Sequence, residues 1–161
     1  MRRNRTRANR SPTGLALGRG AALLLVGMAG CRSSTEPEPS PDVGVVDFYD
    51  QGPAGVIDAP ASVRAGRDFT VTVRTFGGGC VSAAGAAVTY HRAAPERAVV
   101  VPYDNSRVPP GTMCTEALAR PARDLTLRFV TPGTATIRVE GRRQPEGGRA
   151  VVEVAVAVTP A

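Results

Sequence analysis

The chain has 161 residues with 20 Lys+Arg and 14 Asp+Glu, and the resulting formal net charge of +6 would by itself suggest an acidic partner such as nucleic acid. Six of the arginines lie in residues 1–30, which contain no acidic residue, so from Cys31 onward 14 arginines balance 14 acidic side chains. This distribution argues against nucleic acid as a partner. The 131 residues from Cys31 onward suit a single domain with its own core.

Residues 1–30 have the layout of an export signal. A basic stretch, residues 1–10, precedes an apolar stretch, residues 20–30, which ends immediately before Cys31. As a helix, those eleven residues would span about 16 Å. The hydrocarbon core of a bilayer is about 30 Å thick. We therefore expect residues 1–30 to be a cleaved signal peptide and not a transmembrane helix.

The end of this segment, Met28-Ala29-Gly30-Cys31, resembles the lipobox of bacterial lipoproteins, with Met28 in place of the favoured leucine. The resemblance implies diacylglyceryl attachment to the Cys31 sulfur, cleavage before Cys31 and acylation of the new amino group. Several acyl chains anchor a protein to a membrane far more firmly than one does. The alternative is an ordinary secretory signal with an incidental cysteine.

The lipobox resemblance implies a location in the bacterial cell envelope, on the outer side of the cytoplasmic membrane. Arg32 stands where an aspartate would favour retention in the inner membrane, so the outer membrane is favoured if the cell has one. After lipidated Cys31, residues 32–44 read RSSTEPEPSPDVG, a composition too polar to build a core. We expect residues 31–44 to be an extended tether.

From residue 45 to residue 161 the apolar residues recur with a period of two, which is typical of strands with one buried face. Gly- and Pro-rich turns separate these segments, and no long helix is predicted, although Cys114–Pro121 suits one helical turn. The pattern predicts an all-β fold, a single antiparallel β-sandwich, with a barrel as the alternative. The candidate strands are Val45–Tyr49, Val56–Val63, Asp68–Phe76, Ala87–His91, Ala98–Val101, Asp124–Val130, Thr134–Glu140 and Ala150–Val158.

Two stretches, residues 59–80 and 130–142, resemble the opening strands and a later hairpin of bacterial immunoglobulin-like domains. The first combines a proline-containing strand, an Ala-Gly turn and an alternating Val/Thr strand. The resemblance implies an immunoglobulin-like sandwich over residues 45–161. The chain has no tryptophan, so the Cys…Trp…Cys core of antibody domains is absent.

With Cys31 assigned to lipid, Cys80 and Cys114 are the remaining cysteines. In an exported protein an even pair is expected to form a disulfide. A zinc site would need further ligands, and the single histidine, His91, is the only one available. We therefore predict a Cys80–Cys114 disulfide and no metal site.

His91 is also the only candidate for a base that titrates near neutral pH, and the strand alternation places it on the polar face. The chain shows no nucleophile elbow, paired-histidine motif or phosphate loop. We expect no catalytic residues, no cofactor and no enzymatic activity. Two functions remain: a module that contacts envelope proteins or glycans, or a protein that captures a small ligand or glycan.

Aromatic side chains help to distinguish these two functions, because sugar sites use exposed aromatic rings. Alternation places Phe69, Phe129 and Tyr90 on core faces. Phe48, Tyr49, Phe76 and Tyr103 are left over. A pocket, or a cluster of these four side chains, would favour ligand capture over protein contact.

Overall fold

The computed structural model describes residues 41–49, 54–106 and 111–161, which belong to one compact unit, Pro37–Ala161. Within these ranges the chain is almost entirely β, with no α-helix, which confirms the predicted all-β class. The strands are β1 (Asp42–Val43), β2 (Val45–Phe48), β3 (Ile57–Asp58), β4 (Ser62–Arg64), β5 (Asp68–Arg74), β6 (Ser82–His91), β7 (Ala94–Asn105), β8 (Ala122–Arg128), β9 (Gly133–Gln144) and β10 (Arg149–Thr159).

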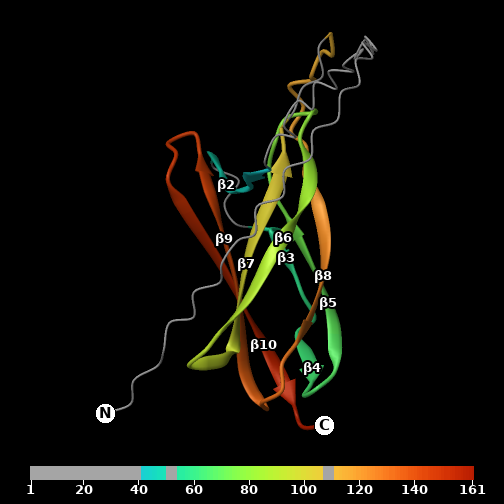
Figure 1. The fold of residues 1–161 in the computed structure, drawn as a ribbon, viewed down its shortest axis with the longest axis vertical. Helices are drawn as coiled ribbons and strands as arrows, with labels where there is room; N and C mark the ends of the chain where they lie inside the picture. The colour runs from blue at the N-terminus through green and yellow to red at the C-terminus, as the bar shows by residue number, and fades with distance from the viewer. Residues whose placement is uncertain (1–40, 50–53, 107–110) are drawn as a thin grey trace, which may run out of the picture. The chain divides into compact units, whose positions relative to one another are not determined.

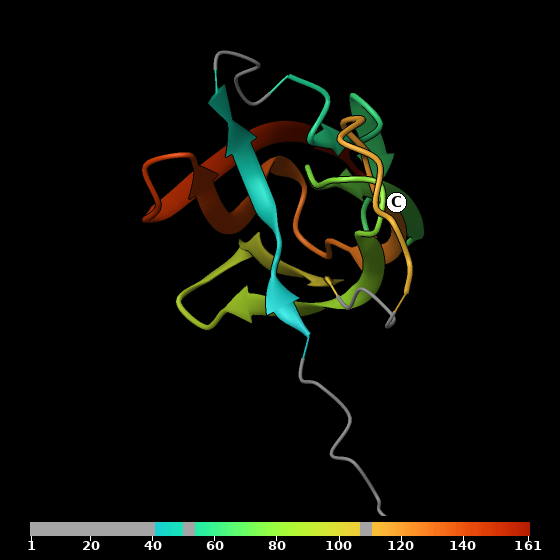
Figure 2. The same cartoon turned by 90° about the horizontal axis from the view of Figure 1, so that it is seen from above.

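The strands form two sheets (Figure 1). The larger sheet has the order β1-β7-β9-β10-β4, with β2 also paired to β9 and β6 paired to β7. The smaller sheet has the order β3-β5-β8. Viewed from above, the larger sheet curls, and the segment containing β1 and β2 runs between the β6–β7 hairpin and the β9–β10 hairpin (Figure 2).

Not every strand pair is antiparallel, which corrects the expectation of a purely antiparallel architecture. β7 pairs with β9 in parallel, as do β2 with β9 and β4 with β10. The parallel β7–β9 pair arises because the chain between these two strands passes through β8, which belongs to the other sheet. Such a crossover returns the chain to the first sheet in its original direction.

The core is formed by the apolar faces that alternation predicts. Val71 and Val73 on β5 and Leu127 on β8 are buried, as is Phe129 just after it. They pack with the buried residues of β9 and β10 in one cluster, including Ala135, Ile137, Val139, Val156 and Val158. These inward faces confirm the predicted alternation in all four strands.

The predicted strand Val56–Val63 is two short strands, β3 and β4. The predicted strands Ala87–His91 and Ala98–Val101 lie within a longer hairpin, β6–β7. They are the second half of β6 and the middle of β7, and His91 pairs with Ala94 across a two-residue turn. Alanine, glycine and proline extend these two strands, and the alternation pattern misses the extensions because those residues carry little β propensity.

The helical turn predicted at Cys114–Pro121 does not form, because Ala119 instead exchanges backbone hydrogen bonds with Gly77.

The larger sheet divides at one end into a fork. β7 and β9 pair with each other only over Arg97–Val100 and Thr136–Val139. Beyond that point the strands are joined through residues 42–48, because β1 pairs with β7 and β2 pairs with the end of β9. We call residues 42–48 the fork segment; its first three residues are the last three of the predicted tether, residues 31–44.

Candidate functional site

The fork segment is fixed to both strands by the backbone of Gly44. Its N–H donates to the carbonyl of Pro102 on β7 (2.8 Å), and its carbonyl accepts from the N–H of Arg142 on β9 (2.9 Å). A Cβ on Gly44 would lie 2.7 Å from Asp104 Oδ2, and a Cβ on Gly141 would lie 2.6 Å from the Gly44 carbonyl. Two glycines therefore permit the close approach of three backbones at the fork.

A charged cluster is buried beside Gly44. Arg123 and Asp104 form an ion pair in which each side chain is only 5% exposed. Thr75 joins it, because its hydroxyl donates to Asp104 (2.9 Å) and accepts from Arg123 (3.0 Å). Arg123 Nε and Nη1 have no hydrogen-bond partner within the described residues. Unpartnered N–H groups in a buried ion pair cost stability, so this cluster depends on its one carboxylate.

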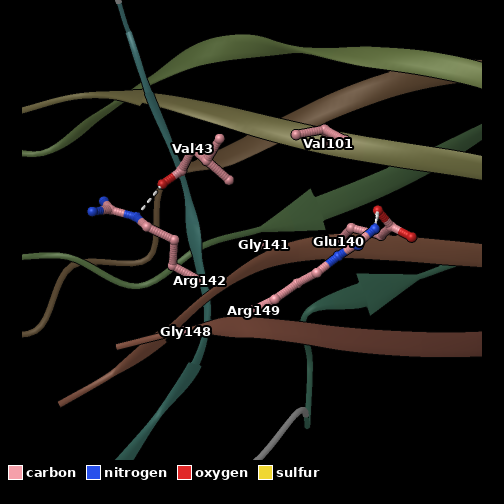
Figure 3. A pocket seen from close by; sticks show the side chains of 7 residues that line it. All are labelled: Val43, Val101, Glu140, Gly141, Arg142, Gly148 and Arg149. Carbon is pink, nitrogen blue, oxygen red and sulfur yellow. Dashed lines mark hydrogen bonds and ion pairs between the residues drawn. The ribbon is translucent and has the colours of Figure 1, made fainter. Parts of the chain in front are cut away.

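A cavity of about 480 Å³ lies at the fork (Figure 3). Its lining residues come from β1, β7 and the β9–β10 hairpin and are Val43, Val101, Glu140, Gly141, Arg142, Gly148 and Arg149. The guanidinium groups of Arg142 and Arg149 point in different directions, toward the Val43 carbonyl and toward Glu140 respectively (Figure 3). The cavity is therefore largely apolar, with charged groups at its edge instead of converging on its centre.

Glu140 is the centre of a charge ladder across β9 and β10. Its carboxylate accepts from Arg138 Nε (2.8 Å) and from Arg149, while Arg138 also donates to Glu153 (2.8 Å). The hydrogen bonds from Arg138 and Arg149 lower the pKa of Glu140 below its ordinary value. The bonds to Glu140 and Glu153 raise the pKa of Arg138. Glu140 and Arg149 belong both to this ladder and to the lining of the cavity.

A second hollow, of about 320 Å³, lies beside the end of the fork segment. Asp47 and Tyr49 line it from the fork segment side, and residues 143–146 line it from the β9–β10 hairpin. Asp47 Oδ2 accepts from Arg143 Nε at 2.6 Å. Most of the lining side chains are polar, which distinguishes this hollow from the apolar cavity.

Of the four aromatic residues that alternation does not place on core faces, three cluster beside the second hollow. Phe48 stacks on Phe76 with ring centroids 5.8 Å apart, and Tyr49 meets Phe48 edge-on at 4.5 Å. Phe76 is buried, whereas Tyr49 is 59% exposed. Tyr103 lies on β7 and joins no ring pair within the described residues. A pocket and a cluster of these aromatic side chains are the two features that, on the sequence analysis, favour ligand capture over protein contact.

The predicted disulfide is present: Cys80 and Cys114 are bonded, with Cα atoms 5.3 Å apart. It joins the turn after β5 to the loop before β8 and holds that loop against the sheet. Beside it, the Gly79 N–H donates to the Thr115 carbonyl at 3.1 Å. Loop residues Met113 and Leu118 are 94% and 42% exposed. The disulfide therefore supports a loop that carries exposed apolar side chains.

Some of the other residues that the sequence analysis singled out lie within the described ranges, and others do not. His91 is exposed at the end of β6, as predicted. Tyr90 contacts the core ring Phe129 but remains 44% exposed, so its predicted core position holds only in part. Cys31, the signal segment and most of the tether lie outside the described residues. Within those residues, no group of His, Cys, Asp and Glu side chains has the arrangement of a metal site, and no helix is long and apolar enough to cross a membrane.

Sequence reasoning missed the fork and both hollows. The predicted tether includes Asp42 and Val43, but these two residues pair with β7, and Val43 lines the cavity. The signal in the sequence was Val43-Gly44-Val45-Val46, an apolar run interrupted by one glycine. Comparisons of the chain with protein-family models, with curated proteins and with solved structures found no match.

Proposed function

We propose that this protein is a lipid-anchored cell-envelope protein whose β domain makes non-catalytic contacts with other envelope proteins. Cys31 supports the anchor, because it ends an apolar run of signal-peptide length after a basic start. The localisation follows from the anchor: the domain stands outside the cytoplasmic membrane, and Arg32 favours the outer membrane where one exists.

We also propose that the domain is an immunoglobulin-like β-sandwich. Two sheets share one apolar core, and the β5–β8 and β9–β10 pairs contribute its two inner faces, which supports a sandwich. The parallel β7–β9 pair is a departure from the antiparallel sheets of the immunoglobulin fold. This departure makes the fork a particular feature of this chain within that architecture.

The observation that carries the contact function is the loop held by the Cys80–Cys114 disulfide. Met113 is 94% exposed beside the bonded cysteine, and Leu118 follows it on the same loop. Loops positioned by a rigid scaffold commonly carry binding residues. An exposed methionine is a flexible apolar side chain that adapts to a partner surface. A disulfide limits the entropy that such a loop loses on binding.

Replacement of Cys31 tests the anchor. A Cys31→Ser variant should remain an uncleaved, unacylated precursor and leave the detergent phase in phase partition. Ser34→Ala, three residues further on, is the matched control and should partition like the wild type. Normal trimming and unchanged partition of the Cys31→Ser variant would show that the lipobox interpretation is wrong.

Crosslinking in intact envelopes tests the contact function. The lipidated wild-type protein should yield discrete crosslinked partners, and Met113→Glu should reduce their yield several-fold. Val130→Glu is the matched control, because Val130 is 63% exposed in a different loop. An equal yield from all three proteins would contradict a contact role for the disulfide-held loop.

A second candidate function, capture of a small ligand or glycan, is favoured by the two hollows at the fork and by the aromatic cluster beside one of them. Ligand sites are concave and combine apolar walls with a few polar groups that fix orientation. The two functions are compatible, since the disulfide-held loop and the hollow beside Tyr49 share no residue.

A further inference from the structure

Tyr49 is held in a backbone conformation that side chains rarely adopt. Its φ is 48°, in the left-handed region, which is an outlier for a bulky residue and is unfavourable. The adjacent Phe48 packs against the core, while the Tyr49 ring is 59% exposed. The unusual backbone therefore lies where the chain passes from a partly buried aromatic residue to an exposed one. Such strain is concentrated at functional sites.

The hollow beside this ring has a distinctive set of polar groups. Asp47 and Glu146 supply carboxylate oxygens, which accept hydrogen bonds, and Arg143 supplies N–H donors. Gln144 supplies both a donor and an acceptor. Arg143 neutralises Asp47 through a 2.6 Å contact between Nε and Oδ2, so Glu146 is the one carboxylate left without a partner among these residues.

We propose that this hollow binds a neutral sugar ring. The face of an aromatic ring suits the apolar C–H face of a pyranose. Carboxylate, amide and guanidinium groups suit hydroxyl groups, each of which both donates and accepts. The excess of carboxylates disfavours an anionic ligand. A volume of about 320 Å³ is at the lower limit of ordinary ligand sites and fits a ligand of one or two rings.

The larger cavity is a weaker candidate for the same ligand. Its two arginines turn toward the Val43 carbonyl and Glu140, and its remaining walls are valine and glycine (Figure 3). Polar groups that could fix the orientation of a sugar therefore do not converge in it. The proposal rests on ligand capture as the second candidate function and names the ligand class of one hollow.

Fluorine NMR of the full chain provides a direct readout, because the chain has only three tyrosines. The lipidated protein, labelled with 3-fluorotyrosine in phosphocholine micelles, is titrated with glucose, galactose and N-acetylglucosamine. We expect a saturable shift of the Tyr49 signal with at least one of them, and no shift of Tyr90 or Tyr103. Glucuronate should bind at least tenfold more weakly, and glycerol should give no saturable shift.

Variants then assign the effect to the hollow. Tyr49→Gly suits the positive φ and removes the ring, so it should fold normally and weaken sugar binding at least tenfold, measured by saturation-transfer NMR on the sugar. Tyr49→Phe should stay within about threefold, since the ring face is retained. Glu146→Gln should weaken binding several-fold, whereas Glu116→Gln, an exposed change on another loop, should have no effect.

Three results would overturn the proposal: no saturable Tyr49 shift with any neutral sugar, equal shifts of all three tyrosines, or unchanged binding by Tyr49→Gly. These results are independent of the anchor and of Met113-dependent crosslinking. Failure of sugar binding and failure of envelope contact are therefore distinguishable.

Discussion

The sheet strands and the fork are held together by different physics. In β5, β8, β9 and β10, alternate side chains face one apolar core, with Arg123 as the charged exception on β8. Stability in these strands is therefore distributed over many similar contacts. At the fork, a seven-residue segment is held by backbone hydrogen bonds through Gly44, two close glycine approaches and one buried ion pair. The first region tolerates many exchanges of apolar residues, whereas the second depends on a few particular atoms.

The largest expected effect is loss of the carboxylate at the fork. Asp104→Ala would leave the Arg123 guanidinium buried with no acidic partner, and breaking such a pair costs about 3–5 kcal/mol. The free energy of unfolding, measured in urea, checks this prediction. The matched control is Asp58→Ala, because Asp58 is 68% exposed and lies 3.7 Å from Arg74. The control should cost about 1 kcal/mol or less.

A double variant separates charge from packing at the same position. Asp104→Leu combined with Arg123→Met removes both charges and keeps apolar volume, so it should recover most of the stability lost in Asp104→Ala. Equal losses in Asp104→Ala and Asp58→Ala would show that the buried cluster contributes no more than a surface pair, and the contrast between fork and sheets would then fail.

The next effect concerns close backbone approach. Gly44→Ala would place a Cβ 2.7 Å from Asp104 Oδ2, and overpacking of this kind costs about 1–3 kcal/mol. Gly78→Ala is the control, because its nearest neighbour would be the Thr115 carbonyl at 3.7 Å, an ordinary contact. Thermal unfolding of both variants provides the comparison. A Gly44→Ala variant as stable as Gly78→Ala would mean that the fork segment moves to accommodate the added methyl group without any loss of stability.

The two regions also differ in how far the sequence predicts them. Alternation predicts which residues of β5, β8, β9 and β10 face inward, because a half-buried strand repeats every two residues. The alternation of apolar residues does not predict the fork. Arg123 is charged yet lies on the inward face with Leu125 and Leu127, and its partner Asp104 is 19 residues away on another sheet. Only the fold brings such residues together.

The candidate site likewise has one part that the sequence predicts and one part that it does not. The Cys80–Cys114 bond follows from the prediction of export, because an even pair of cysteines in an exported protein is expected to form a disulfide. The hollow beside Tyr49 is not, because Asp47 and Arg143 lie 96 positions apart and meet only through the parallel β2–β9 pair. The aromatic residues were recognisable as candidates, and their clustering required the fork.

A smaller effect is expected from acid at the charge ladder. The pKa of Glu140 is lowered below its ordinary value of 4.5 by its bonds to Arg138 and Arg149. The ladder therefore contributes its full stability above that value, and the contribution is lost as the pH falls through the lower folded-state pKa. Melting temperatures of the wild type and Glu140→Gln should converge in acid. A difference that does not change between neutral and acidic pH would rule out this carboxylate as the titrating group.

The smallest effect is expected at His91, which lies at the exposed end of β6, far in sequence from the fork. His91→Ala removes no core contact, and surface changes of this kind stay within about 0.5 kcal/mol. The variant should keep the wild-type melting temperature and the Met113-dependent crosslinks. The matched control is Leu127→Ala, which removes a buried side chain and should lower the free energy of unfolding by about 2–5 kcal/mol, visible as a lower melting temperature. A His91→Ala variant with intact stability but lost partner binding would place a functional residue at the hairpin end. The single histidine would then become the starting point for ligand or catalytic chemistry, and the disulfide-held loop would no longer be sufficient to explain partner binding.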